Sequence, residues 1–282
     1  MGVLPVSRRL KSRGPASVRA MSHPLEGRRA IVCGSTQGIG RACAERLAAE
    51  GSHVTLLARN PDALAEVRDS LPVPLKQRHA WIAGDFADWE TTARSVCEFI
   101  EDRGAVDILV NNTGGPPPGT AFDADPAAYL EAMKPHLALS QGLVQAVVPG
   151  MREKKFGRIV NVVSTSIFMP IRGLGVSNTV RGAIGNWSRT LADELAPDGI
   201  TVNNVLPGFT NTGRLKSIFE RKAEKAGTTP EKIKQQITSS IPAGRIGQPE
   251  ELAALVAFLA GNEAGYINGV SIPVDGGRLA AM

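Results

Sequence analysis

The sequence has few aromatic residues and few cysteines, and it contains no long apolar run. Aromatic residues make up 5% of its 282 residues, and only two of them are tyrosines. No stretch of 18 consecutive apolar residues occurs, so the sequence predicts no membrane-spanning helix. The three cysteines form no CxxC pair, which argues against a disulfide framework and a zinc site. This cysteine usage favours a reducing compartment, and we expect a cytoplasmic protein without a metal.

Net positive charge is confined to the amino-terminal end of the chain. The formal net charge is +5, and residues 1–21 contain five basic residues and no acidic one. Subtracting these five from the 32 basic residues leaves 27, which balances the 27 acidic residues. A nucleic-acid-binding domain concentrates positive charge on the fold itself, so this distribution argues against a nucleic-acid partner.

Residues 1–24 show no apolar periodicity, and we expect a disordered basic tail there. Residues 1–21 also fit an over-long start upstream of Met21, or an organelle transit peptide, because they are rich in arginine and free of acid. A secretory signal fits least well, because no apolar run of 7–15 residues follows the charges.

From residue 25 onward, short apolar runs alternate with helical stretches. The predicted strands cover residues 29–33, 53–58, 79–84, 106–111, 158–163, 200–206 and 267–274. The predicted helices cover residues 38–50, 61–70, 88–103, 125–153, 175–196 and 249–261, with a charged helical insert at about 213–240. This alternation predicts one α/β domain over residues 25–282, with a doubly wound, Rossmann-like parallel sheet between two layers of helices. Pro135 should kink the helix at 125–153. We place Cys33 on a strand and Cys43 and Cys97 on helices, where buried free thiols are common.

A glycine-rich segment follows the first predicted strand and opens the first predicted helix. Its glycines allow a tight turn and a close approach of the backbone to a pyrophosphate. The helix N-terminus supplies free N–H groups and the positive end of a dipole. We therefore expect a bound dinucleotide here, in contact with Gly34, Ser35, Thr36, Gln37, Gly38, Ile39 and Gly40.

The spacing of these glycines, Gly-x-x-x-Gly-x-Gly, resembles the short-chain dehydrogenase/reductase family, and the resemblance extends over residues 27–277. Four further motifs contribute to it, namely Asn111-Asn112-Thr113-Gly114, Asp85 after the third strand, Pro207-Gly208 with Thr212, and Asp275-Gly276-Gly277. The chain looks most like the 3-oxoacyl-carrier-protein reductase branch. The resemblance implies an oxidoreductase that interconverts a carbonyl and an alcohol or acts on an acyl thioester, assembled as a homodimer or homotetramer. It also implies cofactor contacts from Asp85, Phe86, Asn112, Thr113, Gly114, Arg181, Pro207, Gly208, Thr210 and Thr212.

The end of the second predicted strand bears on the choice of cofactor. An acidic side chain there would bind the ribose 2′-hydroxyl group and favour NAD. This chain has Ala58-Arg59-Asn60 instead, and an arginine can pair with a 2′-phosphate. We therefore predict NADP(H), with contacts from Arg59 and Asn60. NAD(H) stays open, because Arg59 also fits a solvated loop charge.

The catalytic positions of the family are only partly kept. The family places a serine after the fifth strand, a tyrosine 13 residues later, a lysine four residues after that, and an asparagine in the long helix. Here these positions hold Ser164, Ser177, Arg181 and His136. A tyrosine, with an ordinary pKa of about 10, donates a proton once a nearby cation favours its ionised form. A serine hydroxyl is a much weaker acid, whereas Arg181 keeps the positive charge and can stabilise an oxyanion.

Three alternatives follow for the chemistry. His136 donates the proton, because histidine titrates near neutrality. Alternatively, Ser164, Ser177 and Arg181 orient the substrate and water supplies the proton. In the third alternative, the pocket is inactive and the protein binds a dinucleotide only to regulate or to act as a scaffold.

By resemblance, the insert at 213–240 is a lid that covers the substrate. It contains seven basic and three acidic residues, so it could attract a phosphopantetheine group, coenzyme A or an acidic carrier protein. A solvated helix face explains the same charges. Arg172, in the loop after Ser164, is a further candidate to clamp a carboxylate together with Arg181.

Overall fold

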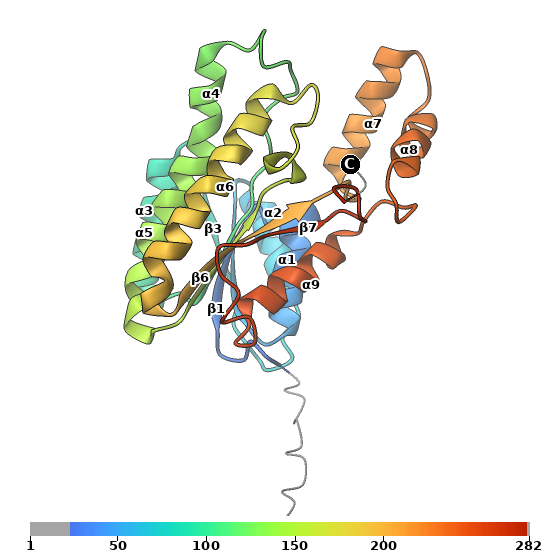
Figure 1. The fold of residues 1–282 in the computed structure, drawn as a ribbon. Coiled ribbons are helices and arrows are strands. Elements are labelled where there is room, and N and C mark those ends of the chain that lie inside the picture. The colour runs from blue at the N-terminus through green and yellow to red at the C-terminus, as the bar shows by residue number, and fades with distance from the viewer. Residues whose placement is uncertain (1–22, 281–282) are drawn as a thin grey trace, which may run out of the picture.

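The computed structural model describes residues 23–280, and these residues form one sheet of parallel strands (Figure 1). The strands are β1 (Arg29–Cys33), β2 (His53–Ala58), β3 (Ala80–Ala83), β4 (Ile108–Asn111), β5 (Gly157–Val162), β6 (Ile200–Pro207) and β7 (Ser271–Val274). Their order across the sheet is β3-β2-β1-β4-β5-β6-β7, and every neighbouring pair is parallel. The predicted doubly wound sheet is confirmed. The predicted tail lies almost wholly outside the described residues.

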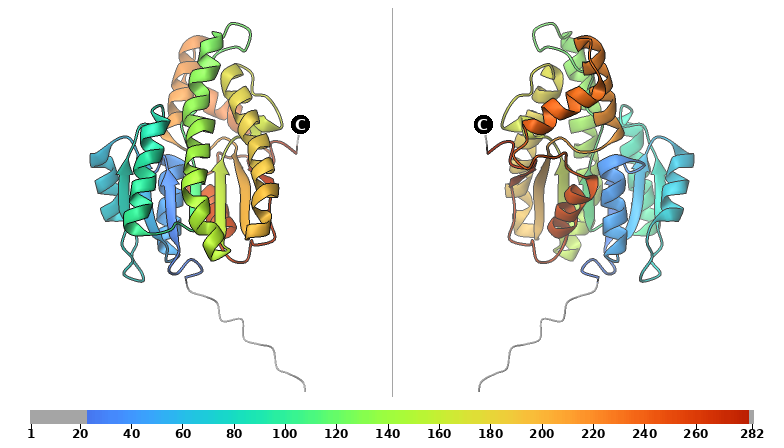
Figure 2. Two further views of the ribbon diagram at one scale, coloured as in Figure 1. Left: turned by 90° about the vertical axis from the view of Figure 1, so that its left-hand side faces the viewer. Right: turned by 90° about the vertical axis from the view of Figure 1, so that its right-hand side faces the viewer.

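Helices cover both faces of this sheet and make it the middle of three layers (Figure 2). One face carries α1 (Gly38–Ala49), α2 (Pro61–Ser70) and α9 (Pro249–Ala260). The other face carries α3 (Trp89–Arg103), α5 (Leu139–Lys154) and α6 (Gly175–Leu195). Successive strand residues point to opposite faces of the sheet and so belong to two separate hydrophobic cores. Val32 packs with the first group of helices, and Ile31 packs with the second. Each fully buried aliphatic side chain of this kind contributes about 1.5–3 kcal/mol.

The order of the strands creates a crevice at the carboxyl edge of the sheet. The chain leaves β1 toward β2 on one side, and it later returns to place β4 on the other side of β1. The loops after β1 and β4 therefore diverge over opposite faces, and this divergence is where doubly wound sheets bind their ligands. The predicted glycine loop and the Asn111–Gly114 segment both lie at this point.

The predicted helix at 125–153 is interrupted. It consists of α4 (Pro126–Met133), one turn of π-helix (Lys134–Ala138) and α5. Pro135 has no N–H to continue the α-helical ladder, and the Leu139 N–H donates to the Lys134 carbonyl group one residue further back than in an α-helix. The predicted irregularity at Pro135 is thus a widened turn. This turn carries His136, whose side chain is only 2% exposed.

Helices α7 (Gly213–Ala226) and α8 (Pro230–Ser239) stand above the carboxyl edge of the sheet, apart from the other helices (Figure 1). They occupy the predicted lid segment and share a small core of their own, which consists of Leu215, Phe219, Ala223 and Ile233. Because this core is separate from the two sheet cores, the packing of the lid depends little on that of the main domain.

Two sequence predictions need correction. The last strand begins at Ser271 rather than at residue 267, because Gly269 has a φ of +71° and the Asn268 side chain accepts the Val202 N–H in place of a backbone group. Cys33 and Cys43 are buried as expected, but Cys97 is exposed, because it lies on the outer face of α3.

Among residues 23–280, no helix has the length and apolar character needed to cross a bilayer, and no cluster of side chains is suited to a metal ion.

Candidate active site

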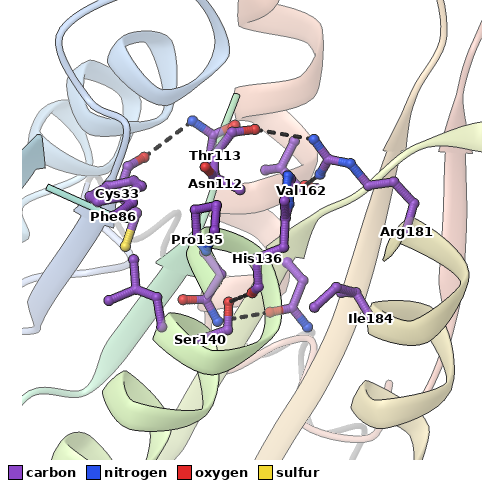
Figure 3. Close-up of a pocket in the computed structure, with 13 residues that line it drawn as sticks. Cys33, Phe86, Asn112, Thr113, Pro135, His136, Ser140, Val162, Arg181 and Ile184 are labelled. Atoms are coloured by element: carbon purple, nitrogen blue, oxygen red, sulfur yellow. Dashed lines mark hydrogen bonds between the residues drawn. The ribbon is translucent and has the colours of Figure 1, made fainter. Parts of the chain in front are cut away.

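The glycine loop between β1 and α1 packs too tightly for larger residues. A Cβ atom on Gly40 would overlap the carbonyl oxygen of Gly34 and would lie 2.7 Å from Asn112 Nδ2. Gly34 itself has a φ of +60°, which side chains rarely tolerate. The Asn112 amide donates to the Cys33 carbonyl oxygen at 3.1 Å and so ties this loop to the end of β4 (Figure 3).

Two features of this loop fit the phosphates of a dinucleotide. Gln37 stands at the N-cap of α1 without a side-chain capping bond, so the first N–H groups of the helix keep their donor capacity. The Ser35 hydroxyl is fully buried and has no hydrogen-bond partner among the described residues. A buried hydroxyl without a partner is costly, and a phosphate oxygen would supply one. The residues present therefore fit the group that the sequence predicts.

The other residues predicted to contact the cofactor surround the same crevice. Thr212 caps α7 and lies close enough to Gly38 that a Cβ there would be 3.2 Å from its methyl group. Thr210 donates to the carbonyl oxygen of Gly208 at 3.3 Å. Arg59 and Asp85 are exposed at the ends of β2 and β3. The Asn60 side chain caps α2 by accepting the N–H groups of Asp62 and Ala63, and its contact with the cofactor stays a prediction.

Arg181 projects from α6 into the end of the crevice and is 9% exposed. Its Nη1 donates to the Val162 carbonyl oxygen at 3.1 Å, and its Nη2 donates to the Thr113 carbonyl oxygen at 3.1 Å (Figure 3). Both acceptors are neutral. Burial and the neighbouring charge of Arg214 lower the pKa of Arg181 to about 10.

His136 and Arg181 both line a small pocket of about 20 Å³ (Figure 3). Burial lowers the pKa of His136 to about 3, and the charges of Arg181 and Arg214 act in the same direction. The ring is therefore neutral at physiological pH. The His136 carbonyl oxygen accepts the Ser140 hydroxyl at 2.6 Å, which holds the widened turn in place.

The two candidate serines differ in what they bind. The Ser164 hydroxyl accepts the Ser166 N–H at 3.0 Å and begins the short helical turn at Thr165–Ile167. Ser177 lies one helical turn before Arg181, and its hydroxyl forms no hydrogen bond with the described residues. Neither tyrosine replaces the missing hydroxyl, because Tyr129 donates to the Ala121 carbonyl oxygen and Tyr266 is fully exposed. Arg172 is exposed in its loop.

A row of buried amides crosses the sheet beneath these side chains, and our sequence analysis did not identify it. Asn111 donates to Asn161 at 2.9 Å, Asn161 donates to Asn204 at 3.0 Å, and Asn204 donates to Ser188 of α6 at 2.8 Å. The three asparagines are register partners on β4, β5 and β6. An asparagine within each of three predicted strands that are otherwise mainly apolar was the available signal. The Asn111 Oδ1 atom lacks a partner and lines the small cavity.

A larger cavity of about 490 Å³ opens on the other side of His136. The loop after β4, helix α4 and the first turn of α6 enclose it, and Gly114, Gly115, Pro135, His136 and Val176 line its inner end. The remainder of its wall is mainly proline, glycine and alanine. This cavity has the volume of a small-molecule site and borders the candidate catalytic residues.

Comparison with known proteins places this geometry in a family. Residues 34–278 match the family model described as enoyl-(acyl carrier protein) reductase. The chain is 33% identical to the NADPH-dependent reductase BacG of Bacillus subtilis over 270 residues, which cover 92% of this chain and 100% of the relative. It is 32% identical to the 3-oxoacyl-[acyl-carrier-protein] reductase FabG of Haemophilus influenzae, covering 90% and 98% of the two chains. The structure of L-sorbose reductase from Gluconobacter frateurii, complexed with NADPH and L-sorbose, superposes with a TM-score of 0.86 at 31% identity, covering 93% and 100%.

Proposed function

The chain belongs to the short-chain dehydrogenase/reductase family, and we propose that it is an NADP(H)-dependent oxidoreductase that interconverts a carbonyl and an alcohol through an atypical site. The observation that carries this proposal is the buried Arg181, which lies one helical turn after Ser177 on α6, at the end of a crevice that fits a dinucleotide. Relatives named as reductases do not favour the inactive scaffold as an alternative.

NADP(H) is the cofactor that fits. The relatives include an NADPH-dependent reductase, and a similar structure is complexed with NADPH. In this chain Arg59 is exposed at the end of β2, where it can reach a 2′-phosphate, and neither adjoining residue is acidic. The glycine loop and the N-terminus of α1 would hold the pyrophosphate.

The side chains around the crevice have separate roles in the reaction of the carbonyl group. When bound, the cofactor supplies the hydride. Ser164 and Ser177 orient the carbonyl oxygen by hydrogen bonds, and Arg181 stabilises the negative charge that develops there. Arg181 suits this role because it is already desolvated and held by two backbone carbonyl groups, so little reorganisation is required.

We propose that water supplies the proton and that His136 is a neutral positioning residue in the wall of the pocket. An imidazolium acid is not available near pH 7, because the pKa of His136 is about 3. A neutral imidazole has a single N–H, and the His136 ring forms a hydrogen bond with the Gly114 backbone in the loop after β4. This proposal corresponds to the second of the three alternatives for the chemistry, in which the serines and Arg181 orient the substrate.

The substrate is a small carbonyl compound or an acyl thioester, and the protein works as a homodimer or homotetramer in a cytoplasmic, reducing compartment. Two groups of exposed apolar side chains support association through two surfaces. One group lies beside or on α4 and consists of Phe122 and Leu130. The other lies on or after α9 and consists of Phe258, Tyr266 and Val270. The relatives include a 3-oxoacyl-carrier-protein reductase.

Turnover and binding measured together test this proposal. The purified protein is titrated with NADPH and with NADH by calorimetry, and NADPH oxidation is then followed with a panel of ketones, oxo acids and oxoacyl thioesters. We expect NADPH binding and measurable oxidation with at least one substrate class. Tight NADPH binding without turnover on any class would contradict the enzymatic function and leave the dinucleotide site intact.

A further inference from the structure

Arg214 occupies a position that helix stability does not explain. It is the second residue of α7, directly after the N-cap residue Thr212 and Gly213. The N-terminus of a helix carries the positive end of the dipole, which disfavours a cation there by a few tenths to about 1 kcal/mol. The first turn of α7 contains no acidic residue to offset this charge. The side chain therefore needs another reason to be at this end of the helix.

Its guanidinium group crosses from the lid to the loop after β4. Arg214 Nη1 donates to the Gly115 carbonyl oxygen at 3.2 Å. A Cβ atom on Gly115 would lie only 2.6 Å from Nη2, so the guanidinium rests directly on the glycine backbone. Gly115 is also part of the inner end of the 490 Å³ cavity. Arg214 is accessible to solvent, so a ligand in the crevice can reach it.

The positive charge around this point has no protein counter-ion. Among residues 23–280, neither Arg181 nor Arg214 forms an ion pair with a carboxylate, and the hydrogen bonds of both guanidinium groups go to neutral carbonyl oxygens. Their charges act on each other and on His136, because Arg214 lowers the pKa of Arg181 and both arginines lower the pKa of His136. Arg181 is buried without a carboxylate partner and Arg214 is exposed beside the crevice, so an anionic ligand can pair with these charges.

Two acidic residues line this cavity, and neither forms an ion pair with Arg181 or Arg214. Asp123 accepts the Thr120 hydroxyl group, and Glu131 pairs with Lys134 at 2.7 Å. The wall between them and His136 is formed by small apolar residues and the three prolines Pro116, Pro117 and Pro118. The wall of the cavity is thus mainly apolar, and Arg214 contacts the backbone of one of its lining residues, Gly115.

We propose that Arg214 binds the carboxylate of the substrate, so that the substrate is a small oxo acid whose apolar remainder occupies the 490 Å³ cavity. A carboxylate fits better than the phosphate of a phosphopantetheine arm. The charge of Arg214 acts on both Arg181 and His136, so it lies near these candidate catalytic residues, whereas the whole pantetheine chain separates that phosphate from the thioester carbonyl. This inference rests on the proposed function and adds the substrate class.

Direct binding measurements test this assignment without requiring turnover. With NADP⁺ present, which cannot reduce an oxo acid, the protein is titrated by calorimetry with pyruvate, acetoacetate and phenylpyruvate, and separately with their methyl esters. Arg214→Met removes the charge but keeps an extended side chain, and Arg214→Lys restores a cation without the planar fork. Lys216→Met is the matched control, because Lys216 is an exposed cation on the same helix, one residue beyond Leu215.

We expect at least one acid to bind more tightly than its ester. Arg214→Met should weaken binding of that acid by about tenfold to a hundredfold, the effect of losing a charge-assisted hydrogen bond. The affinity for the ester and for NADPH should stay unchanged, Arg214→Lys should recover part of the loss, and Lys216→Met should behave like the parent. Equal binding of every acid and its ester would overturn the proposal, as would an Arg214→Met effect confined to coenzyme A thioesters. Selective acid binding without NADPH oxidation would contradict the proposed function while supporting the anion site.

Discussion

The Arg181 guanidinium group donates to the Thr113 carbonyl oxygen at 3.1 Å and thereby joins the middle of α6 to the loop after β4. These segments are 68 residues apart in the chain. The bond fixes the guanidinium at the topological switch point of the sheet, where the glycine loop also ends. Arg181 and the glycine loop thus lie at the same edge of the sheet, and the predictions below probe the role that we propose for each.

Arg59 should set the preference for NADPH. Replacing it in Arg59→Ala removes one charge-assisted contact with the 2′-phosphate, and we expect NADPH binding to weaken by about 1.5–3 kcal/mol. NADH affinity should not change, because NADH lacks that phosphate. Calorimetric titration with both cofactors measures the difference, and Arg78→Ala, at an exposed arginine before β3, serves as the control. Equal affinity of the parent for both cofactors would show that the NADP(H) assignment is wrong.

The glycine loop should not tolerate a methyl group at residue 40. In Gly40→Ala the new Cβ would overlap the Gly34 carbonyl oxygen, so the loop must open and the phosphate site is lost. We expect NADPH binding to fall below detection while the thermal unfolding transition remains cooperative. Gly182→Ala is the control, because a Cβ at Gly182 on α6 meets no atom within 4 Å. Parent-like NADPH affinity in Gly40→Ala would mean that the cofactor does not use this loop.

Restoring the family pair should help a generic ketone. In the double variant Ser177→Tyr with Arg181→Lys, the phenol provides the proton donor that the serine hydroxyl cannot provide. We expect NADPH oxidation with a simple ketone to increase over the parent, measured at saturating cofactor. Circular dichroism must first show a native fold, because Arg181→Lys loses a bond to Val162 or Thr113. A folded double variant without any gain would indicate that the pocket is shaped for other chemistry.

His136 should not titrate in the range in which the protein works. Its pKa in the folded chain is about 3, against 6.5 for an unperturbed histidine. The reduction rate should therefore show no ionisation of this group between pH 5 and 8. His136→Gln should lower kcat but leave NADPH affinity unchanged. Loss of activity in the parent as pH rises through 6–7, absent in the variant, would instead identify His136 as the proton donor.

The same lowered pKa affects stability. Between pH 6.5 and about 3 the unfolded chain binds a proton at residue 136 that the folded chain does not. The unfolding free energy of the parent should therefore fall as pH decreases through this window, by up to roughly 1.4 kcal/mol per pH unit from this one group. Denaturant unfolding at several pH values measures the slope. His136→Gln should show a shallower slope, and an identical slope would contradict the burial of a neutral imidazole.

Sequence patterns alone determined the layers of this fold and the position of the glycine loop. Continuous apolar runs such as residues 29–33 predict strands covered on both faces, and the alternation with helices allows essentially one handedness of connection. The spacing from Gly34 to Gly40 is a local property, because the turn and the helix start lie within a few residues of each other. Such features depend on neighbours in the chain, so they can be predicted from it.

The charge and protonation of the site were decided only by the tertiary structure. His136 was predicted to titrate near neutrality, but the turn that Pro135 widens buries it beside Arg181, and burial together with two arginine charges keeps it neutral. The contact of Arg214 with Gly115 joins residues 99 positions apart. The asparagine row depends on the register of three strands. Desolvation and Coulomb interactions depend on distances through space, which a residue pattern does not contain, so these properties appear only when the chain is folded.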